Sequence, residues 1–214
     1  MNKDLKISIG IICLTCITLV LGLVSTSNAK FPQVIGNWED SNDGWTLNAE
    51  AAEGTTMQPY KGNATLGNYS LKVSAPSGWQ KVITLDMSGD KDVLWDLGIA
   101  AKIQIDVTLV AKEWVVGSGW VKTIESIVIR DDKGDWQQLD PVEAAAWNGS
   151  SDQTFTVTFD VPAQTPPALT QGKLLIVTNY DSVTTPGNFY FDNVRLVGPE
   201  VPAEPNKPAE PNKP

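Results

Sequence analysis

Histidine is absent from this 214-residue chain, and cysteine occurs only at positions 13 and 16. The absence of histidine excludes Ser-His-Asp and Cys-His nucleophile systems and removes the commonest general base and a typical zinc ligand. Arginine occurs only at Arg130 and Arg195, and the chain has no phosphate-binding glycine loop, so a phosphate site is disfavoured. A carboxylate pair of the glycosidase type is the catalytic chemistry that remains.

The acidic residues do not form the pattern that such a pair requires. A Glu-x-Asp-x-x-Glu strand would place alternate carboxylates on one face of a sheet, and this chain has no such strand. Asp106 stands alone between Gln104 and Thr108, and most of the other acids fall in predicted turns. The sequence therefore favours a protein that is not an enzyme.

The N-terminal segment has the pattern of an export signal. Lys3 and Lys6 precede an apolar run at residues 7–24, which is followed by Ser-Asn-Ala. This predicts a secretory signal peptide at residues 1–29, cleaved after Ala29, and a secreted or cell-surface protein. The length of the run also allows an uncleaved membrane anchor. Both cysteines lie in this segment, so no disulfide is available to the mature chain.

The C-terminal segment repeats Ala-Glu-Pro-Asn-Lys-Pro at residues 203–208 and 209–214. Proline at this density blocks helices and sheet ladders and favours an extended polyproline II conformation. Residues 199–214 are therefore predicted to be a semi-rigid spacer that leads to an anchor or a partner domain. A disordered tail without a partner is the alternative.

The charge of the chain limits its partners. Removal of the signal peptide would leave 14 basic and 24 acidic residues, a net charge of −10 against −9 for the whole chain. An acidic surface repels nucleic acids and anionic polysaccharides, whereas neutral glycans meet no such repulsion.

The middle of the chain, residues 30–198, is predicted to be one all-β domain. Apolar residues alternate with polar ones at 103–109 and 154–159, the pattern of strands with one buried face. Further strands are expected at 34–38, 45–49, 69–74, 80–87, 126–130, 136–139, 173–179 and 188–197. Helix signals are nearly absent, except for one short turn at 140–146. Many short strands separated by turns indicate two packed antiparallel sheets in a jelly-roll β-sandwich, which we expect to be a monomer.

Tryptophan is the most prominent feature of composition, with eight residues. Large aromatic side chains are buried on average, so Trp38 and Trp45, beside predicted strand starts, are expected to be core or lid residues and not ligand contacts. Four others lie at predicted strand edges, where a ring can be exposed and stack on a sugar: Trp79, Trp114, Trp120 and Trp136. Alternatively, each of the four rings packs against other side chains of the protein. Polar side chains that could hydrogen-bond the sugar hydroxyls are Gln104, Asp106, Thr108, Gln137 and Gln138.

The last predicted strand has an irregular pattern. Its apolar face is formed by Phe189 and Phe191 and then, one residue out of phase, by Val194 and Leu196. Because side chains alternate strictly in a regular strand, we expect a bulge or kink at Asp192-Asn193.

Three stretches together carry a family resemblance. They are Asn-Trp-Glu-Asp-Ser-Asn-Asp-Gly-Trp at 37–45, Gly-Asn-Tyr-Ser-Leu-Lys-Val at 67–73, and Phe-Tyr-Phe-Asp-Asn-Val-Arg-Leu at 189–196. Their order resembles the galactose-binding-like β-sandwiches, the group that holds many carbohydrate-binding modules. The chain is most similar to modules attached to mannan- and glucan-degrading enzymes.

The resemblance also implies a structural calcium ion. In the resembled sandwiches an early Glu and a late Asp, here Glu39 and Asp192, bind Ca²⁺ beside a glycine loop, here 62–68, that supplies carbonyl oxygens. Oxygen ligands of this kind suit calcium. Alternatively, the two carboxylates only cap turns or accept hydrogen bonds from backbone amides.

We therefore expect non-catalytic binding of a neutral polysaccharide of the mannan or β-glucan type. One alternative is a small glycoside hydrolase or lyase that uses a carboxylate pair, and another is a cell-surface adhesion or structural domain whose tryptophans are all core. Exposed tryptophan without turnover would favour the binding module, and turnover of a glycan would favour the enzyme. Neither observation would favour the adhesion or structural domain.

Overall fold

The computed structural model describes residues 31–131, 136–143, 146–162 and 172–199. The predicted signal peptide, the connection at 132–135 between two of the predicted strands and residues 200–214 of the predicted spacer lie outside the described residues. In the described part of the chain, no helix has both the length and the apolar content needed to cross a membrane.

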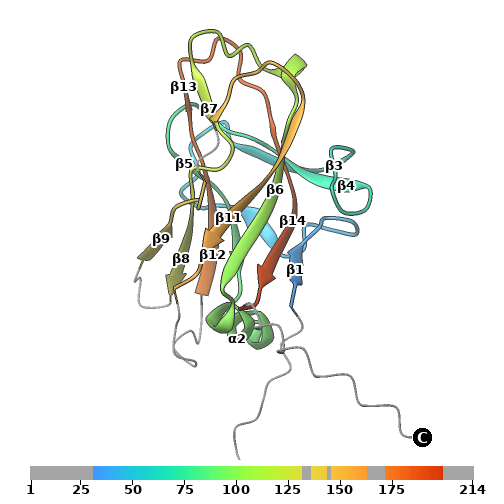
Figure 1. Ribbon diagram of the computed structural model, residues 1–214, viewed down its shortest axis with the longest axis vertical. Helices are drawn as coiled ribbons and strands as arrows, with labels where there is room; N and C mark the ends of the chain where they lie inside the picture. The colour runs from blue at the N-terminus through green and yellow to red at the C-terminus, as the bar shows by residue number, and fades with distance from the viewer. Residues whose placement is uncertain (1–30, 132–135, 144–145, 163–171, 200–214) are drawn as a thin grey trace, which may run out of the picture. The chain divides into compact units, whose positions relative to one another are not determined.

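The described residues form three antiparallel sheets and little helix (Figure 1). The six-stranded sheet contains β1 (Gln33–Gly36), β3 (Thr56–Lys61), β4 (Tyr69–Ser74), β6 (Lys102–Leu109), β11 (Gln153–Asp160) and β14 (Phe189–Val197). The five-stranded sheet contains β2 (Trp45–Leu47), β5 (Gln80–Asp86), β8 (Ser126–Asp131), β9 (Trp136–Leu139) and β12 (Gly172–Thr178). The small sheet contains β7 (Trp120–Lys122), β10 (Ala146–Trp147) and β13 (Tyr180–Asp181). The helices are α2 (Lys91–Ile99) and the 3₁₀ turn η2 (Ala111–Glu113).

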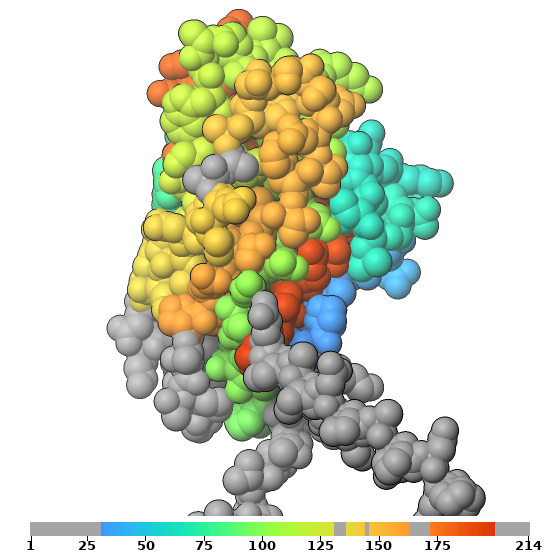
Figure 2. Space-filling view, viewed as in Figure 1, coloured from blue at the N-terminus to red at the C-terminus, as the bar shows by residue number. Residues whose placement is uncertain are grey.

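The two large sheets pack face to face, as the alternating sequences predict. In β6, Ile103, Ile105, Val107 and Leu109 are fully buried in the main core, which β5, β8 and β12 of the other sheet also line. Trp38 and Trp45 are both in this core, as expected. In the order β11-β6-β14-β4-β3, the strands of the six-stranded sheet cross the face seen in Figure 2. The all-β jelly-roll sandwich is therefore confirmed.

The expected irregularity of the last strand is also present. The pairing of β14 with β6 shifts register between Asp192 and Arg195, and Asn193 has a φ of 49°. The shift lets both pairs of apolar side chains reach the core, because Phe189, Phe191, Val194 and Leu196 are all fully buried. The bulge thus reconciles the two halves of the apolar pattern.

Several elements were not predicted, among them the three short strands of the small sheet, helix α2 and strand β3. Helix α2 begins after Asp90, whose Oδ1 accepts hydrogen bonds from the amides of Asp92 and Val93, and it buries only Leu94 and Leu97. Such a narrow apolar stripe is a weak helix signal. Strand β3 is an edge strand with mostly exposed side chains and a proline, Pro59, so it lacks an alternating pattern.

The helical turn expected at 140–146 is wrong in its described part. Pro141 forms a β-bridge with Phe159, and the amide of Val142 donates to the carbonyl of Thr158. The segment therefore pairs with the edge of β11 instead of closing a helical turn on itself. Residues 144 and 145 lie outside the described residues.

Candidate functional site: an aromatic platform on the five-stranded sheet

The outer face of the five-stranded sheet carries a small apolar patch. Leu174 and Ile176 of β12 belong to the main core, whereas Leu175 and Val177 form a separate cluster with Val128 of β8. Because alternate residues point to opposite faces of a strand, this second cluster lies on the outer face. Its three side chains are at most 3% exposed, so other side chains cover them.

Two tryptophans provide an aromatic surface on this face, and we call Trp79 and Trp136 the tryptophan platform. Trp79 immediately precedes β5 and Trp136 begins β9, two strands that are separated by β12 and β8. With neighbouring strands about 4.8 Å apart, β5 and β9 are about 14 Å apart. The ring centroids are nevertheless only 6.3 Å apart and the ring planes differ by 20°, so the two indoles meet over the intervening strands.

Both rings remain available to a ligand. Trp79 is 40% exposed and Trp136 is 43% exposed, although tryptophan is usually well buried. Two nearly parallel indoles that are fixed on a sheet present an apolar surface of the kind on which the C–H groups of a sugar pack.

Lys81 supports the platform. Its Nζ lies 4.4 Å from the ring centroid of Trp136 and 5.9 Å from that of Trp79, within the range of cation–π attraction. The side chain of Lys81 is only 16% exposed, which places it largely under its neighbours. Glu50 forms an ion pair with Lys81, and Arg130 Nη1 lies 3.4 Å from Glu50 Oε1. The hydrogen bond and charge of Lys81 hold the pKa of Glu50 below its usual value, so its carboxylate stays ionised.

Trp120 points away from the core, on the outer side of the small sheet. Its neighbour Val121 is fully buried, so Trp120 and Lys122 point outward, and Trp120 is 37% exposed. Lys122 Nζ lies 5.8 Å from the centroid of the Trp120 ring. Only Asn179 separates β12 from β13, and β13 pairs with β7. Trp120 therefore extends the face that carries the platform.

The expectation that Trp114 is exposed is wrong. Trp114 is 4% exposed and makes edge-on contacts with Trp147, Tyr180 and Phe189 at centroid distances of 5.3–6.1 Å. A Cβ atom at Gly187 would come within 2.4 Å of the Trp114 indole, so glycine allows this close packing. Burial alternates along this segment, with Val115 exposed and Val116 buried, but residues 114–116 are all apolar, so the sequence did not show which of them face the core.

The predicted polar residues are not assembled around the tryptophans. Gln104 and Asp106 lie in β6 on the outer face of the other sheet, so the sandwich separates them from the platform. Gln137 pairs with Ile129, a core residue, and so points to the opposite side of β9 from Trp136. Of the residues considered for this role, Gln138 shares the outer face with Trp136.

Asp106 is also not on a wet surface. It is 5% exposed, and its carboxylate accepts hydrogen bonds from Thr65, Thr156 and Asn193 and pairs with Arg195 at 3.3 Å. Burial raises the pKa of Asp106, but these hydrogen bonds and the Arg195 charge outweigh burial and hold the pKa below its usual value. Asp106 therefore belongs to a structural network, and its expected role in ligand binding is corrected.

Glu39 and Asp192 hold the two ends of the loop at 65–69. Asp192 Oδ2 accepts hydrogen bonds from the amides of Thr65 and Leu66, and its Oδ1 accepts one from Asn193. Glu39 Oε1 accepts hydrogen bonds of 2.6 Å from the amides of Asn68 and Tyr69. These contacts match the alternative to calcium binding, in which the two carboxylates accept hydrogen bonds from backbone amides. Among the described residues, no three His, Cys, Asp or Glu side chains gather as a metal site. Calcium binding thus stays a prediction, and the donors around Asp192 do not favour it.

The hydrogen bonds of Glu39 predict a pH effect on stability. The amide donors, Tyr69 first and then Asn68, lower the pKa of Glu39 from its ordinary value of 4.5. A lowered pKa in the folded state contributes stability that is complete above about pH 4.5 and is lost as the pH falls through the folded-state pKa. Glu39→Gln should therefore destabilise the protein at pH 7, and its difference from the wild type should shrink below pH 4.5 in urea unfolding experiments.

The matched control is Glu53→Gln, at an exposed turn position, which should leave the pH dependence unchanged. The comparison is made in chelator and then with added calcium. A calcium-dependent rise in the melting temperature of the wild type, absent in Glu39→Gln, would show that metal also acts at this loop. An equal destabilisation of Glu39→Gln at pH 3 and pH 7 would contradict the assigned role of the carboxylate.

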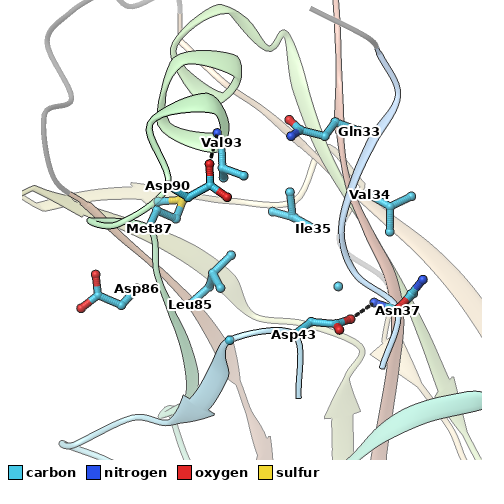
Figure 3. A pocket seen from close by; sticks show the side chains of 12 residues that line it. Gln33, Val34, Ile35, Asn37, Asp43, Leu85, Asp86, Met87, Asp90 and Val93 are labelled. Carbon is cyan, nitrogen blue, oxygen red and sulfur yellow. Dashed lines mark hydrogen bonds between the residues drawn. The ribbon is translucent and has the colours of Figure 1, made fainter. Parts of the chain in front are cut away.

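A cavity of about 490 Å³ lies elsewhere, between β1, the loop at 37–44 and the start of α2 (Figure 3). Three carboxylates line it, and each already accepts a hydrogen bond from a main-chain amide. Asp43 binds the amides of Asn37 and Trp38, Asp86 binds that of Ser88, and Asp90 caps α2. These side chains shape the wall of the cavity, and none of the exposed tryptophans lines it.

Comparisons with known proteins bear on this arrangement. No protein-family model matches the chain, and no curated protein matches it significantly. Solved structures do match. A family 28 carbohydrate-binding module specific for non-crystalline cellulose has a TM-score of 0.54 and 16% identity, with 79% of this chain and 97% of that one covered. The chain has a carbohydrate-binding-module fold.

Two further carbohydrate-binding modules support this assignment of the fold. A family 27 module from Caldicellulosiruptor saccharolyticus, in complex with mannohexaose, has a TM-score of 0.54 and 14% identity, covering 79% of this chain and 98% of its own. The C-terminal family 22 module of Clostridium thermocellum Xyn10B has a TM-score of 0.50 and 15% identity, covering 82% and 98%. At these identities the likeness establishes the β-sandwich fold of such modules and leaves the ligand to be argued from the site.

Proposed function

We propose that this chain is a non-catalytic carbohydrate-binding module that binds a neutral polysaccharide, of the mannan or β-glucan type, on the tryptophan platform. The observation that carries the proposal is the stacked pair Trp79–Trp136, held exposed across the outer face of the five-stranded sheet. The fold that the chain shares with other carbohydrate-binding modules supports the same reading.

The charges around the platform favour a neutral ligand. Lys81, the cation nearest the rings, is paired with Glu50, which also contacts Arg130. A paired cation contributes little attraction to an anionic polymer, and the chain carries a net charge of −9, which repels one. Apolar ring faces with polar groups at their margin are the usual composition of a site for an uncharged polar ligand.

The electrostatics of the same face support binding without turnover. A glycosidase needs one carboxylic acid whose pKa is raised, so that it can protonate the leaving oxygen. Glu50, the acid that contacts Lys81 at the platform, has its pKa shifted in the opposite direction. Export by the signal peptide and spacing from an anchor or partner domain by the proline-rich tail complete the proposal.

The experiment uses the chain from Lys30 onward, because the described core lies wholly within it. Calorimetry and affinity electrophoresis with glucomannan, β-glucan and xylan measure binding, and assays of reducing ends and unsaturated products measure turnover. Binding without product supports the proposal. Product above a buffer control would make the chain an enzyme, and neither binding nor product would favour an adhesion or structural domain.

A further inference from the structure

A pocket opens on the same face, next to the tryptophan platform. Its volume is about 430 Å³, and it is lined by Lys122, Ile124, Glu125, Gln138, Asp140 and Pro141, among others. This volume is at the lower end of the range for small-molecule sites, about 300–1,000 Å³, and suits one or two sugar units.

The pocket lies between the two aromatic surfaces of this face. Gln138 stands two residues after Trp136 on the outer side of β9, so their Cα atoms are about 7 Å apart. On the other side, Lys122 contacts the ring of Trp120. A polysaccharide that runs from the platform towards Trp120 would therefore pass over the mouth of the pocket.

The walls of the pocket offer hydrogen-bonding groups in fixed positions. Glu125 Oε2 accepts from Lys122 Nζ at 2.7 Å and from Asn179 Nδ2 at 3.1 Å, and Gln138 Nε2 donates to Asp140 Oδ1 at 3.2 Å. Ile124 and Pro141 add apolar surface. Carboxylates, an ammonium group and an amide beside apolar carbon match the alternating hydroxyls and C–H groups of a pyranose.

We propose that this pocket receives a single sugar unit carried as a branch on the bound polysaccharide, so that the module prefers substituted main chains to linear ones. The inference rests on the proposed function. A main chain that lies flat on Trp79 and Trp136 cannot also descend into the pocket without leaving the rings, whereas a one-sugar branch can.

The test compares two ligands with the same main-chain length. One pair is a linear β-1,4-mannan oligosaccharide and its galactosyl-substituted form, and the other is a linear cello-oligosaccharide and its xylosyl-substituted form. For the main chain that binds, the substituted form should bind about tenfold more tightly to the wild type, the effect of one additional hydrogen bond to a charged group. In Asp140→Ala, at an exposed pocket residue outside the platform, this preference should fall to about one, with the linear affinity unchanged.

The matched control is Gln58→Ala, at an exposed position of β3 on the other sheet, which should keep the wild-type preference. Thermal unfolding confirms that each variant is folded. Equal binding of linear and substituted ligands by the wild type overturns the branch pocket and leaves the proposed function standing. An equal loss for both ligands in Asp140→Ala also overturns it, because the pocket would then hold the main chain. If neither ligand binds, the proposed function and the branch pocket both fail.

Discussion

Trp136→Ala is expected to weaken polysaccharide binding by about 2–4 kcal/mol, or roughly 30- to 1,000-fold in Kd, because it removes one of two stacked rings at the centre of the site. Trp79→Ala should have a similar effect. The two rings share a contact at 6.3 Å, so the double variant should lose less than the sum of the two single losses. Isothermal titration calorimetry with the best-binding glycan measures all three variants.

The control for this prediction is another exposed tryptophan outside the platform. Trp95 in α2 is 41% exposed, close to the values of Trp79 and Trp136, and Trp95→Ala should bind like the wild type. Near-ultraviolet circular dichroism checks that each variant keeps its fold. If Trp79→Ala and Trp136→Ala, both folded, bind normally, the platform is idle and the ligand binds at another surface.

The largest effect on stability is expected from Trp114→Ala. Loss of a buried indole that contacts three aromatic rings should lower the free energy of unfolding by about 3–5 kcal/mol. For a domain of this size, each kcal/mol lowers Tm by roughly 2–4 °C, so calorimetry should show a fall of about 6–20 °C. Trp120→Ala, at a position that is 37% exposed, is the matched control and should change the free energy of unfolding by less than about 1 kcal/mol. Similar stability in the two variants would contradict the assignment of Trp114 to the core.

Strands with regular alternation were predictable because their apolar residues are the ones that the fold buries. The bounds expected for β4 and β9 agree with the structure, and the phase change in β14 predicted its bulge. Ile103 and Ile105, two positions apart on one strand, both point to the core because side chains alternate between the two faces. Helix α2 and strand β3 were missed because their side chains are mostly exposed, so packing did not impose a period on their sequences.

The candidate site was predicted only in part, because its geometry depends on pairing between distant strands. Trp79 and Trp136 were recognised as residue types at strand edges, but nothing local indicates that their rings meet. The pairing of Lys81 with Glu50 beside the rings was missed, since a lysine and a glutamate in a β protein ordinarily indicate only a solvated surface. Asp106 was assigned to a wet face because alternation identifies the side of a strand but not the loop that covers it.

The position of Trp136 on a short edge strand makes the binding site easier to open than the longer inner strands of the sheet. Strand β9 has four residues and pairs only with β8 among the described strands, while the core beneath is closed by longer strands. Edge hairpins open in local fluctuations that leave the rest of a domain folded. Opening of this hairpin would separate Trp136 from Trp79 and uncover Val128 without disturbing the main core. Occupancy of the platform by a glycan therefore opposes that opening, and amide hydrogen exchange in β9 should slow on binding more than exchange in β6.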